Sequence, residues 1–263
     1  MSDAFLKVRT EGAIAWVTMH RPERLNALNV GLARELREYF SALNARSDAR
    51  VVILQGEGRS FCAGFDLKEA QVAGKGVSDM MEGQHGIRDI MLAMRRCPQP
   101  IISIVQGAAS GGGFALALAS DIRLATPDAR MNAAFIRIGL SGCDMGVSYF
   151  LPRMVGMSVA SHYLLTGRFM DAARALALGL VSAVGSREEM LVEARALAAD
   201  MLNATPLGLR LTKESLGHAV DAGSMEAVTA MEDRNQILCT QGEDFQEGIA
   251  AFLEKRPPRY GFR

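Results

Sequence analysis

A long uncharged stretch constrains the fold of this chain more than any other feature. Residues 97–120 (CPQPIISIVQGAASGGGFALALAS) carry no charged side chain over 24 positions, which is long enough for a transmembrane helix. Two prolines, two glutamines and the triplet Gly111-Gly112-Gly113 argue against one continuous helix. The stretch therefore predicts a buried strand, a glycine turn and a buried helix inside a protein that does not enter a membrane.

The composition fits a folded chain with a large core. Hydrophobic residues make up 49% of the 263 residues and charged residues 22%. The 29 Lys and Arg balance the 29 Asp and Glu, and no basic run is present. Because a nucleic-acid partner requires a basic surface to neutralise phosphates, we expect none. The length suits one large domain, or one domain with an appendage.

The cysteines and the first residues indicate the compartment. The four cysteines are Cys62, Cys97, Cys143 and Cys239. They form no C-x-x-C pair and no metal-ligand spacing with histidine, so we expect no metal site and a reducing, cytoplasmic location. The opening MSDAFLKVRTEG carries charges and no apolar run, and it therefore predicts no secretory signal.

Apolar periodicity in the first half predicts alternating strands and helices. Strands are expected at residues 13–19, 51–55 and 101–106. A helical stripe runs from Leu28 to Leu43, with Asn29 or Asn26 placed to cap it. A second helix is expected around 87–94, before Pro98 and Pro100. This alternation indicates an α/β core.

Helices dominate the sequence after about residue 157. The expected helix starts are Asp171, with Gly179 closing that helix, a capping box of Ser186 and Glu189, Thr205-Pro206, Ser224, and Asp244 with Glu247. The last third of the chain is therefore predicted to be a helical appendage on the α/β core.

Two segments share one layout, in which a glycine-bearing loop follows a buried strand. They are residues 51–69 and 101–122. Two such loops side by side could direct two backbone N–H donors at one oxygen and so form an oxyanion hole. The alternative is that these glycines only permit tight turns. Neither segment contains a phosphate-binding loop or a dinucleotide fingerprint.

Several ordered motifs resemble a known family. They are HRPERLNALN (20–29), SFCAGFDLKE (60–69), SGGGFALALASDI (110–122), LPRMVG (151–156), LTGRFMDAARALALGLVSAV (165–184) and EGIAAFLEKRPP (247–258). Together they resemble the enoyl-CoA hydratase/isomerase family of the crotonase superfamily. The resemblance implies a spiral of ββα units over residues 1–195, which carry the acyl-CoA site, and a helical trimerisation region over 196–263. It also implies a homotrimer or a dimer of trimers.

The resemblance implies an acyl-CoA thioester as ligand, with coenzyme A as part of the substrate and no separate cofactor. The thioester oxygen would be held by the N–H groups of Phe65 and Gly112. The residues implied to contact the substrate are Arg24, Leu25, Ala27, Ala63, Gly64, Asp66, Leu67, Gly111, Ala115, Phe135, Cys143, Phe252 and Lys255.

The chain departs from the family at both glutamates that its hydratases use. Ala115 and Phe135 stand at those positions, and neither side chain can transfer a proton. Asp144 falls where dienoyl-CoA isomerases and dehalogenase-like members carry a working aspartate, and it is the implied acid/base. Without the family, Asp144 is equally a helix N-cap.

Three functions remain open at this point. The first is an enzyme that stabilises a thioester enolate and moves a proton through Asp144. The second is a non-catalytic acyl-CoA binder, and the third is a hydrolase or dehalogenase that uses Asp144 as nucleophile. His85 ends a stretch expected to be mobile, residues 70–86, and is either a surface histidine or part of the acyl pocket.

Overall fold

The structure is a computed structural model, and it describes residues 4–46, 48–69 and 76–261. Its main sheet has the order β1-β2-β3-β4-β6-β9. The strands are β1 (Leu6–Glu11), β2 (Ile14–Met19), β3 (Val51–Gly56), β4 (Ile101–Val105), β6 (Ile122–Ala125) and β9 (Ala183–Val184). β1 is antiparallel to β2, and every other pair in this sheet is parallel. The loops after β3, β4 and β6 therefore leave the same edge of the sheet.

A second, smaller sheet continues from that edge. It has the order β5-β7-β8 and consists of β5 (Ala108–Ser110), β7 (Arg130–Asn132) and β8 (Met170–Asp171). β5 follows β4 after two residues and leads directly into α3 (Gly112–Ala119). The uncharged stretch thus folds as buried strand, glycine turn and buried helix, which confirms the interpretation of its sequence. Among the described residues, no helix combines the length and the apolar character needed to cross a bilayer.

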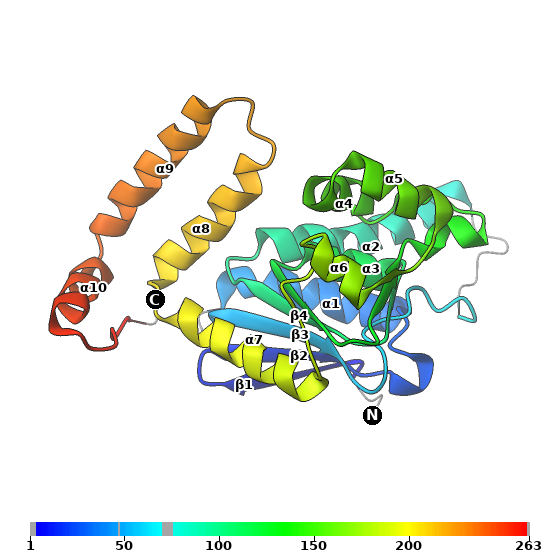
Figure 1. The fold of residues 1–263 in the computed structure, drawn as a ribbon, viewed down its shortest axis with the longest axis horizontal. Helices are drawn as coiled ribbons and strands as arrows, with labels where there is room; N and C mark the ends of the chain where they lie inside the picture. Colours follow the sequence, from blue (N-terminus) through cyan, green and yellow to red (C-terminus); the bar gives the residue numbers. More distant parts are fainter. Residues whose placement is uncertain (1–3, 47, 70–75, 262–263) are drawn as a thin grey trace.

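Helices cover both faces of the main sheet (Figure 1). α1 (Val30–Ala42), α2 (Val77–Arg96) and α3 lie on one face, and α7 (Arg187–Leu202) lies on the other. Strand β3 shows why both faces are apolar. Val52 and Leu54 pack in the cluster with α1 to α3, whereas Val51 and Ile53 pack with Trp16 and α7. All four β3 residues are fully buried, as the continuous β-branched run predicts.

Short helices complete the chain. They are α4 (Val147–Val155), α5 (Met157–Thr166), α6 (Ala172–Ala177), α8 (Pro206–Ala219), α9 (Met225–Thr240) and α10 (Glu243–Glu254), with 3-10 turns at Pro22–Arg24, Leu43–Ala45 and Ala134–Ile138. The caps predicted at Asp171, Thr205 and Ser224 are confirmed by side-chain acceptance of a backbone N–H. The capping box of Ser186 and Glu189 is also confirmed.

The structure decides between the two caps predicted for one helix and corrects the start predicted for another. Asn29, not Asn26, caps α1, since its Oδ1 accepts the N–H of Leu32 at 2.9 Å. The box predicted for Asp244 and Glu247 is wrong, because α10 begins after Gly242 without a side-chain cap. The Glu247 carboxylate instead accepts hydrogen bonds from the Arg256 guanidinium at 2.6 and 2.9 Å.

α2 is longer than its periodicity suggests. It begins at Val77, so residues 77–86 are helical and not part of a loop, which corrects the expectation for that part of 70–86. Residues 70–75 lie outside the described residues. The extra turns matter because they bring the side chains of Gln84 and His85 to a hollow in the surface.

The C-terminal helices α8, α9 and α10 extend away from the sheet (Figure 1). The expected boundary at residue 195 falls within α7, whose Met190, Ala194 and Ala198 pack against the sheet. Lys213 of α8 holds this region to the core. Its buried Nζ donates to the carbonyls of Met94 and Gln99 at 3.0 and 2.8 Å and pairs with the Asp121 carboxylate at 3.0 Å.

Candidate active site

The two glycine-bearing loops lie side by side in a fixed register. The Cys62 N–H donates to the Ala108 carbonyl at 3.0 Å, and the Ser110 N–H donates to the Cys62 carbonyl at 3.0 Å. Cys62 and Ala109 are therefore partners in a parallel bridge. The loop after β3 and the turn before α3 are thus aligned by main-chain hydrogen bonds, as the shared layout of the two segments predicts.

The approach of these loops is too close for side chains. A Cβ on Gly113 would lie 2.0 Å from the Cys62 carbonyl oxygen, and one on Gly64 would lie 2.8 Å from the Ser110 carbonyl oxygen. Gly64 also has a φ of +95°, which other residues rarely adopt. Glycine at these two positions therefore serves the tight packing of the loops, whichever ligand they bind.

The N–H groups of Phe65 and Gly112 differ in their hydrogen bonding from the N–H groups of adjacent residues. The Asp66 N–H donates to Leu28 at 2.9 Å, and the Gly111 N–H donates to Asn132 at 2.8 Å. Within the described part of the chain, the N–H groups of Phe65 and Gly112 have no backbone acceptor. Gly112 is the first residue of α3, where free N–H groups carry a partial positive charge. These two donors are available to a ligand oxygen.

Apolar groups occupy the two positions at which the family's hydratases carry glutamate. Ala115 is fully buried in α3, one turn after Gly111. Phe135 is 3% exposed, and its Cε1 lies 3.3 Å from the position that a Cβ on Gly111 would occupy. The Phe135 ring therefore covers the glycine turn from one side and offers no group that could activate water.

Asp144 is half-buried in the tight turn before α4. Met145 and Gly146 both have left-handed backbone, with φ of 48° and 84°. Gly146 is the N-cap of α4 and no side chain caps this helix, so the alternative that Asp144 is a helix cap is wrong. Left-handed backbone at a non-glycine residue such as Met145 is uncommon and costs free energy, so the surrounding contacts must hold this turn in place.

Met145 joins Asp144 to the glycine turn. Its Sδ lies 3.2 Å, and its Cε 3.6 Å, from the position that a Cβ on Gly112 would take. The Met145 side chain is 3% exposed, so it fills the space between the turn before α4 and the start of α3. The turn that carries Asp144 is therefore packed against the start of α3 through Met145.

A hollow of about 360 Å³ opens beside Asp144. Its lining residues come from α2 and from the segment around the start of α4: Gln84, His85, Arg88, Cys143, Asp144, Met145, Gly146 and Ser148. Two predicted site residues, Asp144 and Cys143, thus share one cavity with His85. The lining combines polar side chains, such as Gln84 and Arg88, with the apolar side chain of Met145.

The predicted binding residues of the first loop lie together with the glycine loop. The Ala63 N–H donates to Leu25 at 3.0 Å, and the Leu28 N–H donates to Gly64 at 2.7 Å. Segments 24–28 and 63–67 therefore run along each other, with Ala27 buried between them and Arg24 and Leu67 exposed at the surface.

The Asp66 carboxylate is committed to the protein itself. Its Oδ2 accepts from the Arg21 guanidinium at 3.1 Å, and its Oδ1 from the Lys68 N–H at 3.2 Å. Burial raises the pKa of Asp66, but these hydrogen bonds and the charges of Arg21 and Arg24 together hold it below its usual value. Asp66 is therefore a charged structural residue at the base of the loop.

Phe252 and Lys255 are not brought to this site within one chain. Helix α10, which contains Phe252 and is followed by Lys255, lies at the opposite end of the molecule from α2 and α4 (Figure 1). The Phe252 side chain is 84% exposed.

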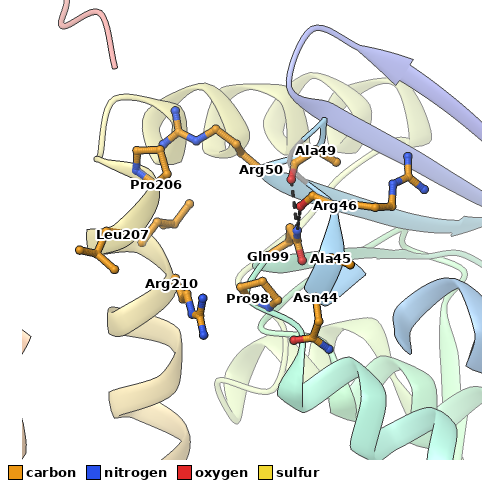
Figure 2. A pocket seen from close by; sticks show the side chains of 11 residues that line it. Asn44, Ala45, Arg46, Ala49, Arg50, Pro98, Gln99, Pro206, Leu207 and Arg210 are labelled. Atoms are coloured by element: carbon orange, nitrogen blue, oxygen red, sulfur yellow. Dashed lines mark hydrogen bonds between the residues drawn. The ribbon is translucent and has the colours of Figure 1, made fainter. Parts of the chain in front are cut away.

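A second hollow, of about 310 Å³, lies where β3 and β4 begin, at the opposite edge of the sheet from the glycine loops. Figure 2 shows Leu207 and Arg210 of α8 facing Pro98 and Gln99 across this hollow. The Gln99 amide group donates to the carbonyls of Leu43, Arg46 and Ala49. None of the predicted site residues lines this hollow.

Two residues of structural importance to the site were not predicted. Gln84 lies in the stretch expected to be a loop, so no helical register placed it near Asp144. Arg21 follows the end of β2, where an arginine gives no sign of being buried. Its guanidinium contacts Asp66, Glu69 and the Ala27 carbonyl.

The fold and the two aligned glycine loops are of the crotonase type. The family model for enoyl-CoA hydratase/isomerase matches residues 9–263. The chain belongs to the enoyl-CoA hydratase/isomerase family.

Individual relatives agree with this assignment. The chain is 38% identical over 252 residues to a protein of Mycobacterium tuberculosis named probable enoyl-CoA hydratase EchA12, covering 93% of this chain and 88% of that protein. It is 31% identical to the 1,2-epoxyphenylacetyl-CoA isomerase of Escherichia coli, covering 97% and 98%. The crystal structure of an enoyl-CoA hydratase from Bacillus anthracis superposes with a TM-score of 0.92 at 30% identity, covering 98% and 100%.

Proposed function

We propose that this protein converts an acyl-CoA thioester by stabilising its enolate and moving a proton through Asp144. The N–H groups of Phe65 and Gly112 would hold the thioester oxygen as negative charge develops on it. The observation that supports this proposal is the packing of Met145 against Gly112, because it joins the turn that carries Asp144 to the residue that offers one of the two free donors.

Isomerisation fits these groups better than hydration. Asp144 would remove a proton from a carbon next to the thioester or conjugated to it, and the same carboxyl would return that proton to another carbon. Hydration requires a second group that activates water, and Ala115 and Phe135 provide none. No separate cofactor is needed in this scheme, because coenzyme A belongs to the substrate.

The coenzyme A moiety would lie along the first loop. Arg24 is exposed beside Leu25 and Ala63, where a cation can meet phosphate. Lys255 and Phe252 were predicted as further contacts, but α10 is remote from this loop in one chain (Figure 1). A homotrimer or a dimer of trimers would allow α10 of another copy to approach it. The absence of any buried side chain on α9 supports such an assembly.

The test is a panel of enoyl-, dienoyl- and aryl-CoA thioesters assayed with the wild type and with Asp144→Asn. We expect Asp144→Asn to lose turnover of the accepted thioester by about 10²-fold or more, while the Kd for the thioester changes only a few-fold. The melting temperature of both proteins is measured in parallel. Full turnover by a stably folded Asp144→Asn protein would refute the role of Asp144.

The second candidate function is binding of acyl-CoA without turnover. The replacement of both usual glutamates by Ala115 and buried Phe135 favours it. This candidate predicts calorimetric binding of thioesters by the wild type and no product from any member of the panel. A third reaction, attack by Asp144 on the substrate, would leave a covalent adduct on the Asp144 peptide in a mass spectrum of rapidly quenched enzyme.

A further inference from the structure

The side chain of Gln84 contacts the Asp144 carboxylate directly. The Gln84 Nε2 donates to Asp144 Oδ1 at 2.5 Å. Gln84 lies in the second turn of α2, and Asp144 lies 60 residues later in the turn before α4. Both side chains are half-buried at the wall of the hollow. This contact ties helix α2 to the proposed acid/base.

The hydrogen bonds to Asp144 are asymmetric. Oδ1 accepts both from Gln84 Nε2 and from the Met145 N–H, the latter at 2.7 Å. Oδ2 accepts no hydrogen bond from the described residues. Two donors that converge on one oxygen fix the rotation of the carboxylate, since the side chain cannot turn without losing both. The remaining oxygen is left for a proton of the substrate.

The neighbours of Gln84 do not duplicate its contact. His85 is the next residue on α2 and is exposed, and Arg88 is occupied by the carboxylate of Asp89 at 2.8 Å. Gln84 is thus the side-chain donor to Asp144 within the described residues. Because its amide is neutral, it orients the carboxylate without adding a fixed charge to the hollow.

We propose that Gln84 is a positioning residue, which acts through Asp144 by holding Oδ1 and presenting Oδ2 to the substrate. This inference rests on the proposed function of Asp144. An error of about 1 Å in the placement of a reacting group can cost about 10²-fold in rate, so loss of this contact should lower kcat. The coenzyme A contacts proposed above do not include α2, so KM should change little.

The experiment compares four variants in steady-state assays of the thioester that the wild type accepts. Gln84→Leu removes the donor at similar size, and we expect kcat to fall about 10- to 100-fold with KM within about threefold. Gln84→His keeps a neutral N–H donor on the same helix, so kcat should stay within about fivefold of the wild type. Glu82→Gln is the matched control, because Glu82 is exposed on the same helix and does not line the hollow. Asp144→Asn is assayed beside them.

The outcomes separate the two proposals. If Asp144→Asn keeps full turnover, the proposed function fails and the role of Gln84 fails with it. If Asp144→Asn is inactive while Gln84→Leu keeps the wild-type kcat, only the positioning role is overturned. Equal losses in Gln84→Leu and Gln84→His, or a loss expressed in KM alone, would show that Gln84 supports the structure of the hollow and not the orientation of Asp144.

Discussion

Arg21 and Asp66 form an ion pair in which both side chains are 5% exposed. Arg21 Nη2 lies 3.1 Å from Asp66 Oδ2 and also contacts Glu69 at 2.7 Å. The pair joins the turn after β2 to the loop that carries Phe65. The Asp66 carboxylate therefore belongs to the residue next to Phe65, whose N–H is a proposed donor to the substrate.

Asp66→Asn should reduce the free energy of unfolding by about 3 kcal/mol, because among the described carboxylates it leaves the buried Arg21 guanidinium only the more exposed Glu69 as a charged partner. The measurement is urea unfolding at pH 7. Glu69→Gln is the matched control and should cost less, about 1 kcal/mol, since Glu69 is half-exposed. Equal stability of Asp66→Asn and the wild type would contradict a structural role for this pair.

The same pair predicts a dependence of stability on pH. The pKa of Asp66 is lower in the folded chain than its usual value, so the pair stabilises the fold above the unfolded pKa of about 3.9. That contribution is lost as the pH falls through the lower, folded pKa. We therefore expect the stability difference between the wild type and Asp66→Asn to shrink below about pH 4, in a series of unfolding curves.

Gly112→Ala and Gly113→Ala should have different effects. A Cβ on Gly112 would meet the ends of two flexible side chains, Leu28 Cδ1 at 2.7 Å and Met145 Sδ at 3.2 Å. We expect Gly112→Ala to fold and to lose turnover by about 10²-fold, because Met145 and the donor must shift. A Cβ on Gly113 would lie 2.0 Å from a main-chain oxygen, so that variant should be expressed largely unfolded. Circular dichroism and thioester assays distinguish the two.

Cys143 should react with maleimide before the buried cysteines. It is exposed and lines the hollow beside Asp144. Burial raises the pKa of Cys62 to about 12 and also raises the pKa of Cys97, so both thiols stay protonated. Labelling at pH 7.5 should lower turnover in the wild type and leave Cys143→Ser unaffected. Peptide mapping that finds Cys62 labelled in the folded protein would contradict the structure.

Hydration of crotonyl-CoA should be slow. A positioned acid/base group is worth about 10²- to 10⁴-fold in rate, and two are replaced here. We expect kcat/KM for hydration to be at least about 10²-fold below that of a family member with both glutamates, assayed in parallel. Rates as high as in that enzyme, in protein purified from a host that lacks its own hydratase, would show that another group activates water.

Much of the fold follows from local sequence patterns. The runs around Val51 and Ile101 contain enough β-branched residues to specify buried strands, and the caps at Thr205 and Ser224 depend on contacts within one turn. Glu247 could not be read in this way, because its partner Arg256 lies beyond the end of the helix. The first turns of α2 also lacked an apolar stripe, since only its second half is buried.

The candidate site likewise has one part that the sequence predicts and another part that only the folded structure reveals. Its glycine loops could be predicted, because two main chains that approach this closely leave no room for a Cβ. The contact of Gln84 with Asp144 could not, because it joins residues 60 positions apart on two different elements. The burial of Arg21 likewise depends on Asp66, which only the folded chain brings near.

The bridge between Cys62 and Ala109 fixes the main chains of the two glycine loops relative to each other. Phe65 and Gly112 would bind substrate through their main chains, and no exchange of side chain deletes a peptide N–H unless proline enters. Ala115 and Phe135 lie on α3 and the 3-10 turn Ala134–Ile138, and Asp144 lies in the turn before α4. Under the proposed function, a side chain at any of these three positions can therefore be exchanged without removing either of the two main-chain donors.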